Sequence, residues 1–169
     1  MKVIGVTGYK NAGKTGLVER LVAELVGRGL RVSTLKHAHH DARIDTPGTD
    51  SDRHRAAGAR QVALVAGRRW AVMTELDEGE AEPTLADMLA RLDPADLVVV
   101  EGWKALPFPK IEVWREGLGH PLRAPDDPSV VAVAAKGAVP PCPCPVLDLD
   151  DTRALADLAQ RAARPVHEL

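Results

Sequence analysis

The sequence predicts an α/β fold in which a mainly parallel, twisted sheet carries helices on both faces. Three observations lead to this fold class. Segments with the apolar pattern of strands alternate along the chain with segments that repeat apolar residues every three to four positions. Residues 97–100 have the sequence LVVV, which is typical of a strand buried on both faces of a parallel sheet. A glycine-rich turn joins the first expected strand to the first expected helix.

The first expected strand is Lys2–Thr7, a short apolar run rich in β-branched residues. The helix that follows should end at Gly27 and Gly29, because glycine is common just past a helix end. Its apolar stripe has the helical period and consists of Leu17, Val18, Leu21, Val22, Leu25 and Val26.

The turn between these two elements contains Gly8, Gly13, Lys14 and Thr15 in the spacing G-x-x-x-x-G-K-[ST] of a P-loop. The glycines allow a close backbone approach, so that consecutive N–H groups can point at phosphate oxygens. Lys14 adds a positive charge at the β- and γ-phosphates, and the Thr15 hydroxyl can bind Mg²⁺. A chance glycine-rich turn is the alternative, but the strand before it and the helix after it favour a P-loop NTPase-like nucleotide site.

The second expected strand, Arg31–Leu35, leads into a segment without apolar periodicity. We call residues 36–55 the histidine-rich segment; it is dense in histidine, aspartate and arginine, and Pro47–Gly48 marks a turn within it. Asp50 or Ser51 is expected to cap a short helix that ends near Gly58. A solvated loop is the alternative reading of this segment.

This density of polar side chains favours a binding role. Lys36, His37 and Arg53 could contact a phosphate group of the nucleotide or of a second anionic ligand. Asp45 or Asp50 could help to order Mg²⁺.

Two alternating runs, Gln61–Ala66 and Arg69–Thr74, predict a β-hairpin or strand pair at the edge of the sheet. After an acidic connector, Thr84 and Asp87 resemble a capping box that opens a helix over Leu85–Leu92.

The buried strand Asp96–Val100 ends in Glu101. A carboxylate at the C-terminal end of such a strand, beside a P-loop strand, is placed to hold Mg²⁺ directly or through water, as the Walker B acid does. We therefore expect Glu101 to be a metal-binding and catalytic residue. An ordinary strand-end acid facing solvent is the alternative.

Later segments add further strands and a helix. Lys110–Trp114 and Val130–Ala134 are the expected strands. The connector Pro140–Pro145 contains Cys142 and Cys144, too few ligands for a zinc site unless a second subunit shares them. Asp151 caps a final amphipathic helix that carries Leu155, Leu158, Ala159 and Ala162.

Length and composition fit one nucleotide-binding domain over residues 1–169. The chain has 169 residues, a net charge of -2 and 45% hydrophobic residues. This charge lacks the basic excess of a nucleic-acid-binding protein, and no apolar run approaches the roughly 18 residues that span a membrane. A strand-like start without the features of a signal peptide leads us to expect a cytoplasmic protein.

Four stretches together are more specific than the P-loop: GYKNAGKT, KHAHHDARIDTPGTDSDRHRAAGA, VVVEGWK and PKIEV. In this combination the chain resembles the MobB family (molybdopterin-guanine dinucleotide biosynthesis protein B) of P-loop GTPases, over roughly residues 1–115. The resemblance implies a homodimer that binds GTP and Mg²⁺, hydrolyses GTP slowly and acts beside the guanylyltransferase of molybdenum-cofactor biosynthesis. Molybdopterin or its guanine dinucleotide is a further ligand that the resemblance suggests.

The resemblance also assigns site residues. It implies that Lys14 and Glu101 are catalytic and that Thr15 and Glu101 bind the metal. The nucleotide or cofactor would be bound by Gly8, Lys10, Asn11, Ala12, Gly13, Lys14, Thr15, Gly16, Lys36, His37, His39, His40, Asp45, Asp50, Ser51 and Arg53, while Gly48 completes the family's loop pattern. Two departures are Ala42, where relatives tend to have an aromatic residue, and Ala135–Lys136, where they often have Ser–Asp or Thr–Asp.

Base specificity and function class are left open by the residues themselves. Asn11 is the single asparagine, so the chain cannot contain the Asn-Lys-x-Asp guanine motif, and ATP is as compatible with the P-loop as GTP. The cluster of His37, His39 and His40 would also suit a nickel metallochaperone GTPase. A small-molecule phosphotransferase is the third alternative, although no arginine-rich lid is evident.

Overall fold

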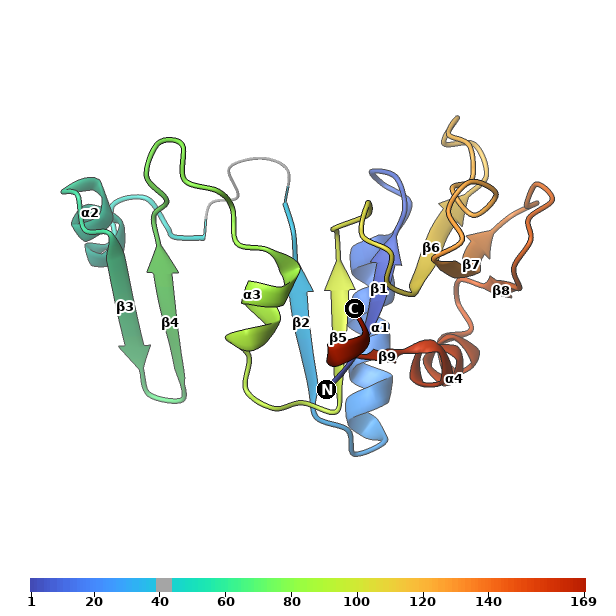
Figure 1. Cartoon of the computed structure of the whole chain (residues 1–169), viewed down its shortest axis with the longest axis horizontal. Coiled ribbons are helices and arrows are strands. Elements are labelled where there is room, and N and C mark those ends of the chain that lie inside the picture. Colours follow the sequence, from blue (N-terminus) through green and yellow to red (C-terminus); the bar gives the residue numbers. More distant parts are fainter. Residues whose placement is uncertain (39–43) are drawn as a thin grey trace. The chain divides into compact units, whose positions relative to one another are not determined.

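The computed structural model describes residues 1–38 and 44–169 (Figure 1). Within this range the chain forms two compact units. The larger unit consists of Met1–His37 with Asp87–Leu169, and the smaller unit is Ala38–Ala86. We describe the two units separately.

The larger unit is built on a mainly parallel sheet, which confirms the predicted fold class. Its strands run in the order β2-β5-β1-β6-β7-β8, with all neighbours parallel, and a short β9 pairs antiparallel with β1. The strands are β1 (Lys2–Thr7), β2 (Val32–Lys36), β5 (Leu97–Glu101), β6 (Lys110–Arg115), β7 (Val130–Lys136), β8 (Val146–Asp148) and β9 (Arg164–Pro165).

Strand β5 lies between β1 and β2, and its run of Leu97 to Val100 is buried throughout, as its sequence predicted. Strands β8 and β9 were not predicted. They have only three and two residues; β8 follows a proline-rich connector and β9 itself contains Pro165, so neither shows a strand pattern.

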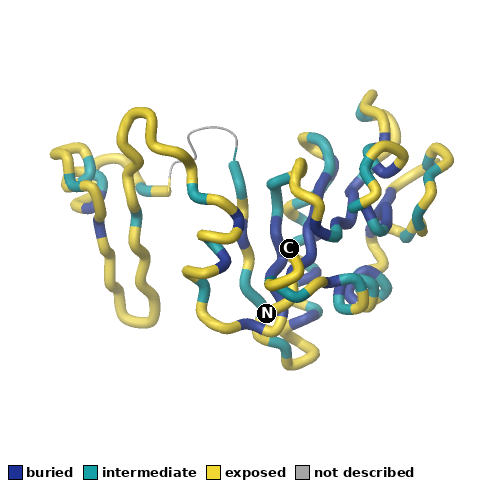
Figure 2. Tube along the Cα trace, in the orientation of Figure 1, coloured by how far each residue is buried: buried dark blue, intermediate teal, exposed yellow. Residues whose placement is uncertain are grey.

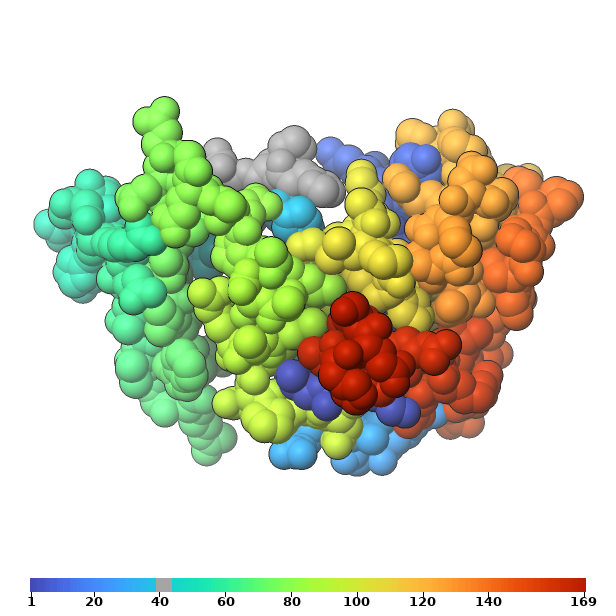
Figure 3. Space-filling view, viewed as in Figure 1, coloured from blue at the N-terminus to red at the C-terminus, as the bar shows by residue number. Residues whose placement is uncertain are grey.

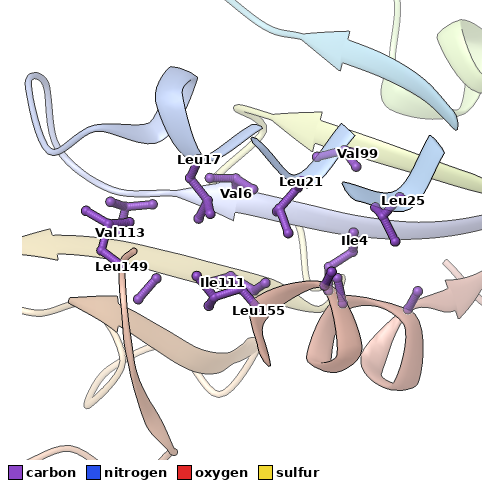
Figure 4. Close-up of a cluster of buried hydrophobic side chains, with 14 of the residues drawn as sticks. Ile4, Val6, Leu17, Leu21, Leu25, Val99, Ile111, Val113, Leu149 and Leu155 are labelled. Carbon is purple, nitrogen blue, oxygen red and sulfur yellow. The ribbon is translucent and has the colours of Figure 1, made fainter. Parts of the chain in front are cut away.

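Helices α1 (Lys14–Gly27) and α4 (Thr152–Ala162) pack together over one face of this sheet. Figure 4 shows Leu17, Leu21 and Leu25 of α1 beside side chains of β1, β6 and α4 in one cluster. The three leucines are completely buried, and burial of one such side chain contributes about 2 kcal/mol. The predicted cap of α4 is confirmed, because the Asp151 carboxylate accepts a hydrogen bond from Ala154 N at 3.0 Å.

The opposite face carries a second apolar cluster. Because side chains alternate along a strand, Ala132 and Ala134 of β7 face different neighbours from Val133 and Ala135. Ala134 belongs to the cluster under α1 and α4, whereas Val133 and Ala135 pack with Leu122, Ala124 and Val130. Cys142 and Cys144 are free thiols that lie partly buried against this second cluster. Burial raises the pKa of Cys144 to about 11.

The two ends of the chain meet at the base of β1. Lys2 pairs with Pro165 and Val3 with Arg164, and Val166 N donates to Met1 O at 3.1 Å. A 3₁₀ turn, Val166–Glu168, follows β9. Figure 3 shows the C-terminal residues packed against the first residues of the chain.

The smaller unit contains α2 (Asp50–Ala56), β3 (Gln61–Ala66) and β4 (Arg69–Thr74). The hairpin prediction is confirmed, but the two strands form a sheet of their own rather than the edge of the main sheet. Figure 2 shows most of this hairpin in the colour of exposed residues.

Two helix boundaries differ from the predicted ones. The residue before α2 is Thr49, in extended conformation, so Asp50 and Ser51 are already helical and neither is the cap. Helix α3 (Leu85–Ala90) contains the boundary between the two units and ends two residues before Leu92.

Candidate functional site

The glycine-rich turn follows the C-terminal end of β1 and passes close to β6. Gly8 has a φ of +140°, and a Cβ atom there would lie 2.4 Å from the carbonyl oxygen of Val113. No side chain fits that space, so only glycine allows this approach. Asn11 also has a positive φ, 66°, which shows how tightly the turn curls.

The turn ends at the N-terminus of α1, as a phosphate site requires. Gly13 precedes the helix, and no side chain caps it. The first N–H groups of α1 therefore have no partner within the helix and lie at the positive end of the helix dipole. Such a helix end is a favourable site for an anion. Lys14 crosses the turn, and its Nζ donates to Tyr9 O at 2.9 Å.

The predicted metal ligands lie together beside the turn. Thr15 Oγ1 donates to Glu101 Oε2 at 3.5 Å, and Lys36 Nζ lies 4.0 Å from Glu101 Oε1. A hydroxyl and a carboxylate are oxygen ligands of the kind that Mg²⁺ takes alongside water and phosphate. These residues, brought together from α1 and β5, therefore fit a magnesium ion.

Positive charge dominates around Lys14. Burial lowers the pKa of Lys14, the Glu101 carboxylate opposes this shift, and the cations of Lys36, Arg123 and Lys104 add to it. Three other cationic side chains thus act on the Lys14 ammonium, and an anion with several charges would be attracted to this group.

The ends of β2 and β5 are joined beside Glu101. His37 N donates to Glu101 O at 2.8 Å, and a Cβ on Gly102, which has a φ of +113°, would lie 2.7 Å from the Cβ of His37. Trp103 has a φ of +42°, and its ring stacks on the His37 ring with centroids 4.7 Å apart. The aromatic pair therefore lies next to the proposed metal ligand.

Three residues that the sequence analysis did not single out also contact the turn. The Tyr9 ring stacks on His120 with centroids 4.2 Å apart, and the Arg123 guanidinium lies over the same ring at 4.8 Å. Arg115 Nε donates to Ala12 O at 3.0 Å. All three end or follow β6, and their position at a strand end was the one signal that could have identified them.

A buried carboxylate positions Arg123. Glu112 in β6 is fully buried, and it accepts hydrogen bonds from Arg123 N at 2.9 and 3.0 Å and from Ala124 N at 2.9 Å. Burial raises the pKa of Glu112, while these backbone donors oppose the shift. The segment after β6 is therefore anchored to the strand beside the P-loop.

The histidine-rich segment is divided between the two units. Lys36 and His37 belong to the larger unit with the P-loop and Glu101, whereas Asp45, Asp50, Ser51 and Arg53 belong to the smaller one. His39 and His40 lie outside the described residues. Asp45 Oδ1 accepts hydrogen bonds from Thr46 N, Thr49 Oγ1 and Ser51 Oγ at 2.9 to 3.1 Å, so it orders the turn before α2.

Within residues 1–38 and 44–169, no three histidine, cysteine, aspartate or glutamate side chains lie close enough together to hold a metal ion. No helix in the same range is long and apolar enough to span a membrane.

The chain is similar to known proteins along most of its length. The model of the family described as "Molybdopterin guanine dinucleotide synthesis protein B" (MobB) matches residues 3–136. The molybdopterin-guanine dinucleotide biosynthesis adapter protein of Haemophilus influenzae is 44% identical over 132 residues, 78% of this chain and 73% of that protein. The protein of the same name from Escherichia coli is 38% identical over 158 residues, which are 92% of this chain and 89% of that protein.

Solved structures agree with the fold. The crystal structure of Bacillus subtilis MobB aligns with a TM-score of 0.74 at 23% identity, covering 97% of this chain and 99% of that one. A MobB homologue from Bacillus stearothermophilus aligns with a TM-score of 0.65 at 26% identity, covering 99% of both chains.

Proposed function

The chain belongs to the MobB family, and from this premise we propose that it is a GTP-binding adapter protein in molybdenum-cofactor biosynthesis. It would act beside the guanylyltransferase that makes molybdopterin guanine dinucleotide, in the cytoplasm, with molybdopterin or the dinucleotide as a second ligand. The observation that carries the proposal is the meeting of the P-loop lysine, Thr15 and Glu101 at one edge of a parallel sheet.

Each of these residues would make a different contact with a bound nucleoside triphosphate or its metal ion. The turn and the first N–H groups of α1 bind the phosphate oxygens, and Lys14 leaves its bond to Tyr9 O to pair with the β- and γ-phosphates. Thr15 and Glu101 would hold Mg²⁺, which would supply charge neutralisation at the phosphates. Lys36 would add a positive charge beside the Glu101 carboxylate.

A nucleotide titration tests the proposal directly. Calorimetry with GTP, ATP, GDP and ADP, with and without Mg²⁺, should show binding of GTP that weakens when the metal is removed. Repeating the titration with molybdopterin present tests the second ligand. Absence of binding for all four nucleotides would contradict the proposed function.

We expect Glu101→Gln to lower the rate of GTP hydrolysis at least about tenfold while changing GTP affinity much less. The amide keeps the size of the side chain but lacks the charge that organises the metal. Steady-state hydrolysis and calorimetry on the same samples separate the two effects.

Glu19→Gln is the matched control, because it removes one carboxylate from an exposed position on α1. Its hydrolysis rate should equal that of the wild type. An unchanged rate in Glu101→Gln would show that this acid is a structural strand-end residue.

We also propose that the protein is a homodimer that uses the hairpin of the smaller unit. One face of the β3–β4 pair carries Val65, Trp70 and Val72, which are 79, 72 and 50% exposed. A two-stranded sheet is marginally stable in water, and within the described residues β3 and β4 pair only with each other. A second copy of the same hairpin would cover this apolar face and would stabilise the two-stranded sheet.

We expect Val65→Glu to shift the protein from dimer to monomer, with a dimer dissociation constant at least about 30-fold higher. Val65 is mostly exposed, so the charge should leave the folded monomer intact. Sedimentation equilibrium measures the change. Arg69→Glu places a charge change on the other face of the hairpin and should leave the dimer unaffected; a wild-type protein that is monomeric at micromolar concentration would contradict the assignment.

A further inference from the structure

The side chain of Arg123 lies against the P-loop, and one of its donors has no acceptor. Its guanidinium is 4.8 Å from the centroid of the Tyr9 ring, and Tyr9 directly follows Gly8 in the turn. Arg123 Nε is buried and makes no hydrogen bond with any of the described residues. A buried donor without an acceptor is unfavourable, so an anion that lets this guanidinium form hydrogen bonds would be bound well.

The backbone of Arg123 is fixed independently of its side chain. Both oxygens of the buried Glu112 carboxylate accept from Arg123 N, at 2.9 and 3.0 Å. On the other side of the residue, Asp127 N donates to Arg123 O at 2.9 Å. The Glu112 carboxylate is thus used by backbone donors, and the guanidinium can change its partner while the Arg123 backbone stays where it is.

The position of Lys14 indicates which part of a nucleotide would lie nearest to Arg123. In a P-loop the backbone N–H groups surround the α- and β-phosphates, whereas the lysine reaches the β- and γ-phosphates. Lys14 Nζ lies at the start of the turn, 2.9 Å from Tyr9 O. The γ-phosphate would therefore lie beside Tyr9, the residue whose ring Arg123 contacts.

The charge of Arg123 acts at the same place. Its cation is one of those that oppose the charge of Lys14 and help to lower the pKa of that ammonium. Two like charges so close together repel each other, and an anion between them would replace this repulsion by two attractions. The contact with Tyr9 and the effect on Lys14 thus agree on the location of the guanidinium.

We propose that Arg123 binds the γ-phosphate and makes the site prefer a nucleoside triphosphate to a diphosphate. Arg123 would approach from the β6 side of β1, whereas Glu101, the proposed metal ligand, comes from β5 on the other side. A planar guanidinium can stay stacked on the Tyr9 ring and donate two parallel N–H groups to phosphate oxygens. This inference rests on the proposed function and identifies a residue that distinguishes GTP from GDP.

We expect Arg123→Ala to lower the affinity for GTP about 10- to 100-fold, as for the loss of a charge-assisted hydrogen-bonded pair, and to change GDP affinity less than about threefold. The variant should fold, because the backbone N–H of residue 123 keeps Glu112 as its acceptor. Arg123→Gln keeps part of the stem against Tyr9 without the charge and should give the same result. Calorimetric titrations with GTP and with GDP, both with Mg²⁺, measure the two affinities.

Arg31→Ala is the matched control for the lost charge. The Arg31 side chain is 73% exposed and precedes β2, at the opposite edge of the sheet from the P-loop, so both affinities should equal those of the wild type. An equal loss of GTP and GDP affinity in the Arg123 variants would show that the arginine only supports the turn through Tyr9, and would overturn the inference. Unchanged affinities would overturn it as well. Failure of the wild type to bind either nucleotide would instead contradict the proposed function.

Discussion

Lys14→Ala abolishes measurable binding of GTP and of ATP and leaves the fold intact. Among the described residues the Lys14 ammonium donates a single hydrogen bond, to Tyr9 O, so its loss removes little that stabilises the native state. In the complex it would make charge-assisted bonds to two phosphates, and removal of such a group costs about 3–4 kcal/mol, or a factor of 10²–10³ in affinity. Calorimetric titration gives the affinity, and circular dichroism with thermal unfolding tests the fold.

Lys2→Ala provides the comparison for a lost positive charge. Lys2 is exposed at the opposite end of β1, so its removal should leave nucleotide affinity unchanged. Wild-type affinity in Lys14→Ala would show that the glycine-rich turn is not a phosphate site.

Glu112→Ala lowers the free energy of unfolding by about 3 kcal/mol. The substitution removes the acceptor of two N–H groups, that of Ala124, which is buried, and that of Arg123, which is partly buried, and a buried group without an acceptor costs about 1–3 kcal/mol. The energy recovered by no longer burying a carboxylate offsets part of this loss, which is why the expected value is not larger. Urea unfolding followed by circular dichroism measures the change.

Glu116→Ala is matched to this experiment because the Glu116 carboxylate also accepts a backbone hydrogen bond, from Ala138 N at 3.1 Å, but is exposed. Water replaces it as the acceptor, so the expected loss is below about 1 kcal/mol. If the two variants lose the same stability, burial of Glu112 is not what anchors the segment after β6.

The parts of the fold that could be predicted depend on neighbours in sequence. The P-loop follows from eight consecutive residues, and β5 follows from an apolar run that ends in Glu101. The parallel-sheet rule then places the two at one edge, and the 3.5 Å contact between Thr15 and Glu101 agrees with it.

The remaining features depend on contacts between distant segments. The carboxylate of Glu112 accepts from backbone groups eleven and twelve residues later, and no local pattern distinguishes it from an exposed strand residue. The prediction that the hairpin lies at the edge of the main sheet was wrong for a similar reason. An alternating pattern predicts two strands but carries no information about which sheet they join. The roles expected for His39, His40, Asp45, Asp50, Ser51 and Arg53 stay predictions.

The pairing of β9 with β1 has a consequence for folding during synthesis. Arg164 and Pro165 contact Val3 and Lys2, which gives these contacts one of the largest sequence separations in the chain. Contacts of high contact order form slowly, because a long loop must close before they stabilise anything. Lys2 and Val3 of the P-loop strand therefore lack their antiparallel neighbour until residue 165 has left the ribosome, so this part of the sheet cannot form while the preceding segments are being synthesised.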